Sequence, residues 1–250
     1  MIRAAGIVVP AHNEEHLIAG CLQALRIAME PVAVPVQVCV VADRCTDATA
    51  ELAKDELPGV VVLHNVVRRP LGQVRDLGMQ YLLRAFGNYP RDQVWLLGTD
   101  ADTRVRPDWI QRQLDHAQRG VDAVTGLVDL EPAQHLTADV RSAYQALVAA
   151  RTRPADHDHI HGASFGVRAS AYAGVGGYRA LDTGEDRDLW FRLEAAGYVM
   201  LQPRDLDVLT SSRLRGRAHG GLADLLTAMC TPGVPVAVGI DQEEPHAPET

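Results

Sequence analysis

The chain has 250 residues, of which 47% are hydrophobic and 22% are charged, as in ordinary globular proteins. This composition excludes a disordered or fibrous chain, and the length permits one large domain or two small ones. The formal net charge is −8, and no basic run stands out, so we expect no nucleic-acid partner. Because the chain is acidic overall, an anionic ligand would have to be bound by a local positive group, such as a metal ion or a helix N-terminus.

Hydropathy and cysteine usage place limits on the setting of the protein. No stretch approaches the ~18 apolar residues of a membrane helix, and the short apolar start is not typical of a signal peptide. We therefore expect no integral membrane segment and a cytoplasmic protein. No Cys-x-x-Cys pair occurs, which favours free thiols in a reducing compartment. The cysteines are Cys21, Cys39, Cys45 and Cys230.

Short β-branched runs alternate with helical patterns through the first half of the chain. Near-continuous apolar strands of this kind are typical of a parallel sheet with both faces covered. In chain order, the predicted elements are strand 6–10, helix 17–25, strand 36–41, helix 46–54, strand 60–63, helix 72–86, strand 94–99, helix 107–119 and strand 123–128.

The alternation loosens in the second half, where no repeat and no linker is visible. We predict one α/β domain over residues 1–238, with a mostly parallel sheet flanked by helices and a small extension in the second half. An acidic tail over 239–250 is predicted to be disordered. The remaining predicted elements are helix 137–150, a His-rich stretch, strand 163–167, helix 186–196 and a basic loop over 213–219.

Polar residues follow three of the predicted strands at the point where each strand ends. They are residues 12–14 (His-Asn-Glu), 43–44 (Asp-Arg) and 100–102 (Asp-Ala-Asp). In an open parallel sheet, ligands bind outside the carboxyl ends of the strands, so we expect these residues to form a site. A divalent cation, or a ligand rich in hydrogen-bond donors, would relieve the repulsion between the acids.

Asp100 and Asp102 carry the sharpest signal for a metal. Carboxylates spaced i, i+2 in extended backbone point to the same side. Mg²⁺ and Mn²⁺ prefer such oxygen ligands and complete their shells with substrate phosphates. The alternative is a polar turn that caps the helix beginning near Pro107. The position at the end of a buried strand favours the metal site.

A second acidic pair, Glu185 and Asp186, follows Gly184 and precedes an apolar helical stripe. One interpretation is a helix N-terminus, where acids are stabilised by the helix dipole. The other is a general base, because a carboxylate beside other acids tends to have a raised pKa. From these residues alone, the helix terminus is favoured.

His157, His159 and His161 alternate along the chain, so in extended backbone they share a face. Three imidazoles on one face could bind Zn²⁺, which gives a zinc-dependent hydrolase as an alternative function. The competing interpretation is a solvated loop or the wall of an acceptor pocket.

Five motifs stand in a fixed order between residue 5 and about residue 200. They are Val8–Glu15, Val40–Thr49, Asp100–Thr103 with Pro107–Ile110, His161–Arg168, and Gly176–Tyr178 with Gly184–Leu189. Together they resemble the family 2 glycosyltransferases, which have the GT-A fold. The order of the motifs makes the resemblance specific.

The resemblance implies a nucleotide-diphosphate sugar donor and Mn²⁺ or Mg²⁺ as the cofactor. In this family pattern Asp43 binds the base edge, Asp100 meets the ribose and the metal, and Asp102 ligates the ion. The other implied donor-side residues are Pro10, Ala11 and Glu14 at the nucleoside, Arg75 at the diphosphate or ribose, and His219 as a third metal ligand.

In the catalytic half, the resemblance implies that Asp186 deprotonates an acceptor hydroxyl and that Glu185 supports it. His161 and Gly162 are implied to border the acceptor and the donor sugar. Attack on the sugar C1 from the face opposite the diphosphate inverts the anomeric centre, so we predict an inverting enzyme. The arginines of the basic loop are candidates to close over the phosphates.

Two departures from the family pattern narrow the prediction. Ala42-Asp43 leaves one acid to bind the base, and the Gln-x-x-Arg-Trp signature of processive members is absent. We therefore predict one sugar transfer to a soluble or peripheral hydroxyl acceptor, with a homodimer as one candidate assembly. Residues 1–129 are expected to bind the nucleotide sugar, and residues 130–238 the acceptor. A non-catalytic nucleotide-sugar-binding protein is the remaining alternative.

Overall fold

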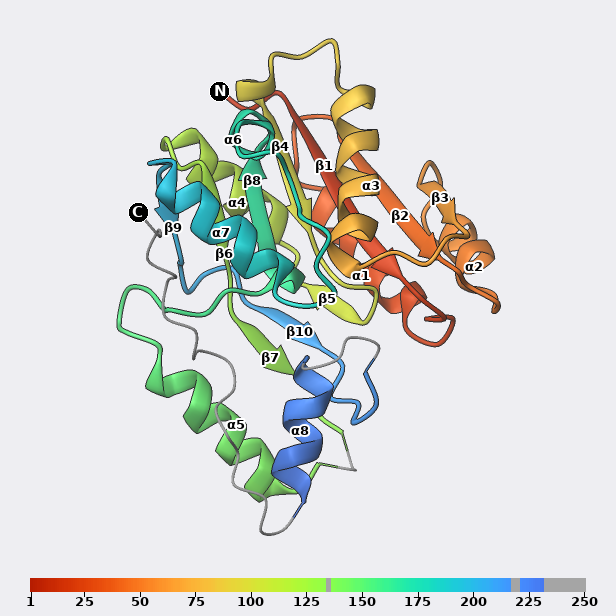
Figure 1. The fold of residues 1–250 in the computed structure, drawn as a ribbon, viewed down its shortest axis with the longest axis vertical. Coiled ribbons are helices and arrows are strands. Elements are labelled where there is room, and N and C mark those ends of the chain that lie inside the picture. The colour runs from red at the N-terminus through yellow and green to blue at the C-terminus, as the bar shows by residue number, and fades with distance from the viewer. Residues whose placement is uncertain (134–135, 217–220, 232–250) are drawn as a thin grey trace, which may run out of the picture.

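The computed structural model describes residues 1–133, 136–216 and 221–231. Its centre is a seven-stranded sheet built from β1 (Ala4–Ala11), β2 (Val36–Asp43), β3 (Val61–Asn65), β4 (Val94–Gly98), β6 (Ala123–Thr125), β8 (Phe165–Arg168) and β9 (Met200–Leu201). The strand order is β3-β2-β1-β4-β8-β6-β9, and only β8 runs antiparallel to its neighbours. The predicted α/β architecture with a mostly parallel sheet is confirmed (Figure 1).

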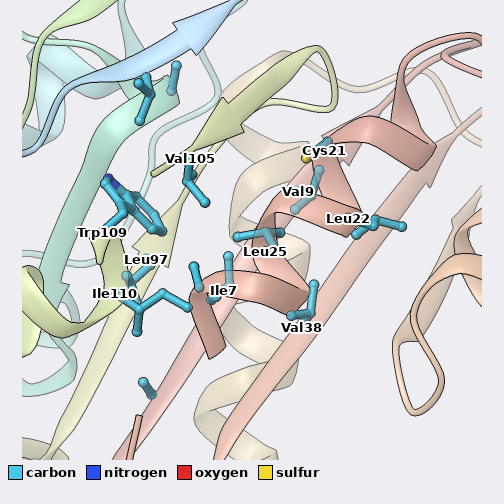
Figure 2. Packing of buried hydrophobic residues seen from close by; sticks show 14 of the residues in the cluster. Ile7, Val9, Cys21, Leu22, Leu25, Val38, Leu97, Val105, Trp109 and Ile110 are labelled. Carbon is cyan, nitrogen blue, oxygen red and sulfur yellow. The ribbon is translucent and has the colours of Figure 1, made fainter. Parts of the chain in front are cut away.

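Helices cover both faces of this sheet, as its continuous apolar strands require. Alternate residues of β1 point to opposite faces, so Ile7 and Val9 belong to one apolar cluster and Val8 to the other. The cluster around Ile7 is drawn in Figure 2. One face carries α1 (Ile18–Met29), α2 (Thr49–Glu56) and α4 (Trp109–Gln118), and the other carries α3 (Leu71–Ala85), α6 (Ala169–Gly174) and α7 (Glu185–Ala195).

Helix α3 lies unusually close to β1 because Gly78 has no side chain. A Cβ atom at Gly78 would come within 2.6 Å of Val8 Cγ1, so even alanine would force the helix outward. This close approach places Arg75, one turn earlier on α3, beneath the carboxyl edge of the sheet.

A smaller three-stranded sheet forms from β5 (Thr103–Val105), β10 (Val208–Thr210) and β7 (Val128–Leu130). Beside it, α5 (Ala138–Ala150) and α8 (Leu222–Cys230) pack together around Tyr144 and Leu226. Figure 1 shows this helical pair set apart from the seven-stranded sheet. It forms an apolar cluster of its own, separate from the two that cover the main sheet.

The predicted strand over 123–128 is wrong as one element, because the chain breaks into β6 and β7. The break falls at Gly126, where a Cβ atom would lie 1.9 Å from the carbonyl oxygen of Leu206. Only glycine permits this crossing of two backbones, and the chain passes there from the large sheet into the small one.

Two further properties can be read from the described residues. None of the helices in the described ranges has the length and apolar character needed to cross a bilayer. All four cysteines carry free thiols, with Cys21 and Cys39 buried and the other two partly buried.

Candidate active site

The predicted site residues come together at one edge of the central sheet. Strands β1, β2 and β4 are parallel, so the residues that follow them meet at the same edge. Strand β8 is antiparallel to β4, and Gly98 of β4 pairs with Phe165 at the start of β8. The single helical turn Gly162–Ser164, directly before β8, therefore lies at this edge too.

Pro10 and Ala11, predicted to contact the donor, are the last two residues of β1, and Glu14 follows them with only 5% of its surface exposed. Asn13 (φ 54°) and Arg44 (φ 49°), which follow β1 and β2, adopt the left-handed backbone conformation. Such conformations cost energy in non-glycine residues and cluster at functional sites.

Asp43 ends β2 and is held by a partner that sequence reasoning missed. Asn65, the last residue of β3, donates from Nδ2 to Asp43 Oδ1 at 2.6 Å and is itself buried. Arg44 Nη2 pairs with the other oxygen, Oδ2, at 3.2 Å. The rule that found Asp43, a polar residue at the end of a strand, would have found Asn65 if it had been applied to the third strand as well.

Arg75 connects the two acidic pairs. Its guanidinium is 3% exposed, with Nη2 2.6 Å from Asp100 Oδ1 and Nε 2.9 Å from Glu185 Oε1. The remaining nitrogen, Nη1, is buried and finds no hydrogen-bond partner among the residues that the structure describes. The predicted contact of Arg75 with the donor stays a prediction; the structure shows a buried cation shared between carboxylates.

Asp186 is fixed by two backbone amides. Gly162 N–H donates to its Oδ2 at 2.7 Å, and Arg187 N–H donates to its Oδ1 at 2.8 Å. Helix α7 begins at Glu185 after Gly184 in the left-handed conformation (φ 72°), so both acids lie in the first turn. The structure is therefore compatible with both interpretations of this pair, as the acidic first turn of a helix and as the source of a general base.

Burial dominates the electrostatics of this second acidic pair. It raises the pKa of Glu185, against the opposing effect of Arg75, and the charge of Asp186 raises it further. Burial likewise raises the pKa of Asp186, to which Asp100 adds. A single guanidinium among three carboxylates leaves this group short of positive charge.

Asp102 and Glu14 are bridged by an arginine from a distant part of the sequence. Arg213 Nη1 lies 2.7 Å from Glu14 Oε2, and its Nη2 lies 2.8 Å from Asp102 Oδ2. Burial, and then the charge of Asp100, raise the pKa of Asp102 to about 6, while Arg213 opposes that shift.

The side chains of Asp100 and Asp102 supply oxygen ligands that fit a divalent ion. Both are carboxylates, the ligands that Mg²⁺ and Mn²⁺ prefer, and Asp102 already binds a cationic group. His219, the predicted third ligand, lies outside the described residues. Within residues 1–133, 136–216 and 221–231, no three His, Cys, Asp or Glu side chains are grouped as a metal site.

The histidine rings lie side by side, as their alternation predicts, but two of their nitrogens are engaged within the protein. His159 and His161 stack with centroids 5.6 Å apart. His157 Nδ1 accepts from the His159 backbone N–H at 3.1 Å, and His159 Nε2 lies 3.0 Å from the Val148 carbonyl oxygen. Burial lowers the pKa of His161 to about 3, so its ring is neutral. This arrangement gives the zinc-hydrolase alternative no support.

Comparison with protein families agrees with this geometry. The model of glycosyl transferase family 2 matches residues 6–172, about two thirds of the chain. The chain belongs to this family. The match contains Glu14, Asp43, Arg75 and the Asp100–Asp102 pair, and ends before Glu185 and Asp186. Comparison with curated proteins gave no match.

Solved structures similar to this family member share its GT-A fold. The mannosyltransferase PcManGT from Pyrobaculum calidifontis, in complex with GDP-Man and Mn²⁺, has a TM-score of 0.62 at 20% identity and covers 86% of this chain. S. aureus TarS 1–349, in complex with UDP-GlcNAc, has a TM-score of 0.62 at 13% identity and covers 87%. The present chain spans 59% and 60% of those two chains, respectively.

Proposed function

We propose that the protein transfers one sugar from a nucleotide-diphosphate sugar to an acceptor hydroxyl, with inversion at the anomeric carbon. The observation that carries this proposal is the placement of two acidic pairs at one sheet edge, joined through Arg75 at 2.6 and 2.9 Å. One pair suits a metal-bound diphosphate and the other suits a general base. Membership of glycosyl transferase family 2 supports the same reaction.

On the donor side, Pro10, Ala11 and Glu14 line the nucleoside, and Asp43 accepts hydrogen bonds from the base. Asp100 and Asp102 would hold Mn²⁺ or Mg²⁺, which neutralises negative charge on the departing diphosphate. The similarity to a fold relative solved with GDP-Man and Mn²⁺ supports this donor class and this kind of cofactor.

On the acceptor side, Asp186 takes the proton of the attacking hydroxyl. The bond from the acceptor oxygen to C1 forms as the bond from C1 to the diphosphate oxygen breaks, so one displacement inverts the centre. Two backbone N–H groups orient the carboxylate, and burial raises its pKa above the ordinary value, which makes it a stronger base. Glu185 supports Asp186 through Arg75, and His161 and Gly162 border the sugar and the acceptor.

The two halves of the chain divide this work. We assign the nucleotide sugar to residues 1–129 and the acceptor to residues 130–238, as part of one catalytic domain. The acceptor is a soluble or peripheral hydroxyl compound and the setting is the cytoplasm, with four free thiols in support. A homodimer stays one candidate assembly.

A binding screen tests the donor proposal. We expect a nucleoside diphosphate with Mn²⁺ to raise the melting temperature, since a ligand at a hundred times its Kd adds ~2.7 kcal/mol to the free energy of unfolding. Asp102→Ala should weaken this metal-dependent binding, whereas Asp55→Ala, at an exposed position on α2, should leave it unchanged. Equal binding by Asp102→Ala and wild type would remove Asp102 from the metal site.

A transfer assay tests the reaction itself. NMR of the product should show the anomeric configuration of the donor inverted, and retention would overturn the single-displacement mechanism. If the protein bound donor and Mn²⁺ but neither hydrolysed nor transferred the sugar across a broad acceptor panel, the non-catalytic binder would be the better description.

A further inference from the structure

Arg213 reaches the donor side of the site from the chain that follows β10. The backbone is held there by Ser211 N–H, which donates to the Asp102 carbonyl oxygen at 3.0 Å. From this position the guanidinium spans Glu14 and Asp102 at 2.7 and 2.8 Å. Residues nearly 200 positions apart in the sequence are thereby joined across the donor site.

Both partners of Arg213 are poorly hydrated carboxylates. The side chain of Glu14 is 6% exposed and that of Asp102 is 15% exposed. Without a cation between them, both charges would be buried beside Asp100, whose charge already raises the pKa of Asp102. The site therefore needs positive charge whether or not a donor is bound.

A divalent ion on Asp102 and the guanidinium of Arg213 compete for the same place. Arg213 Nη2 contacts Asp102 Oδ2 at hydrogen-bond distance, and a cation bound to this carboxylate would lie within a few ångströms of it. Like charges at that spacing repel, and a doubly charged ion offsets more of the negative charge than one guanidinium does. Arg213 is also 26% exposed, so it can leave toward solvent.

We infer that Arg213 is the resident cation of the unliganded donor site, and that it must leave Asp102 when the divalent ion binds. The inference rests on the metal site proposed above and adds its regulation. In the free protein Arg213 bridges Glu14 and Asp102, and this ion pair lowers the affinity of the site for a metal. The metal alone therefore binds weakly, because it must first displace an ion pair.

The test measures binding of Mn²⁺ without nucleotide, by titration calorimetry, to wild type and Arg213→Gln. We expect Arg213→Gln to bind Mn²⁺ at least fivefold more tightly. Arg112→Gln is the matched control, since Arg112 also bridges two carboxylates, Asp108 at 2.6 Å and Asp205 at 3.4 Å, away from the site. It should bind Mn²⁺ as wild type does, which separates local release from the change in net charge.

Thermal unfolding gives a second readout that needs no activity. Removal of Arg213 should lower the melting temperature, and Mn²⁺ should raise it more in Arg213→Gln than in wild type. Adding Asp102→Asn to Arg213→Gln should abolish that extra gain.

Unchanged, weaker or undetectable Mn²⁺ binding by Arg213→Gln would overturn the inference. If wild type still bound a nucleoside diphosphate in a Mn²⁺-dependent way, only the role of Arg213 would fall. If no variant and no nucleotide combination bound Mn²⁺, the proposed metal site would fall with it.

Discussion

Two arginines serve the two acidic groups of this site, and they differ in how firmly they are held. Arg75, on α3, is 3% exposed. It lies inside the fold, paired with Asp100 after β4 and with Glu185 on α7. Arg213 is 26% exposed and reaches Glu14 and Asp102 from a late segment. If a buried guanidinium leaves, its carboxylate partners stay buried without a counter-ion. A partly exposed guanidinium can instead exchange its place with another cation or with water. The first arrangement fixes Asp100 and Glu185 relative to each other, and the second leaves Glu14 and Asp102 able to change their cationic partner.

The largest effect should come from Asp186→Asn. Loss of a general base reduces turnover by roughly 10²–10⁴-fold, while nucleotide affinity should stay close to that of wild type. Steady-state kinetics and calorimetry of the same preparation measure both quantities. Glu194→Gln, at an exposed position of α7, should have neither effect. If Asp186→Asn lost donor binding in proportion to turnover, the two acidic groups would not have separate roles.

Stability should separate the two arginines directly. Arg75→Met leaves buried carboxylates without their cation and should lower the free energy of unfolding by about 3–5 kcal/mol. Arg213→Met should cost less, because its partly exposed site admits water or ions. Urea denaturation measures both, with Arg153→Met as the control for a surface pair, expected to cost less than either of them. Equal costs at positions 75 and 213 would contradict the comparison.

A smaller effect is expected from Gly162→Ala, which probes how tightly Arg75 is enclosed. The new Cβ atom would lie 2.7 Å from Arg75 Nη2, and overpacking of this kind costs about 1–3 kcal/mol. In an Arg75→Met background the penalty should shrink, because the crowded nitrogen is gone. A double-mutant cycle from unfolding curves measures that coupling. Additive effects would show that the clash is relieved elsewhere.

A last effect is a difference in the pH dependence of stability. Burial raises the pKa of Glu185 from 4.5 to about 7, so the folded protein binds this proton more tightly than the unfolded chain. The resulting stability is fully present below about pH 4.5 and is lost as the pH rises through about 7. Relative to Glu185→Gln, the wild-type free energy of unfolding should therefore fall across that interval. Parallel pH profiles would show that Glu185 keeps an ordinary pKa.

Much of the site could be predicted because strand ends are visible in sequence. The acids after β1, β2 and β4 were found from apolar runs that stop at polar residues, and the runs themselves follow from burial on both faces. The three strands of the small sheet have only three residues each and gave no pattern to detect. Their positions depend on tertiary contacts such as the one at Gly126.

The pairing of acids with arginines could not be predicted from the sequence either, because it too depends on tertiary contacts. Residues 110 positions apart meet in the pair of Arg75 with Glu185, and nothing local to either one indicates the other. The same holds for Arg213 and Glu14. The resemblance assigned Glu185 and Asp186 to deprotonation of the acceptor, but only the fold shows that Glu185 shares Arg75 with Asp100.

The sequence positions of the paired strands also constrain the order in which the sheet can assemble. Strands β1 to β4 pair among themselves within the first 98 residues, so this part can form as soon as it is made. Strand β6 pairs with β8 and β9, both of which follow it in the sequence. It must therefore wait for residues up to 168 before it gains a neighbour, and such distant pairings form slowly. The edge made of β8, β6 and β9 therefore depends on later parts of the chain than the pairing of β1 to β4 does.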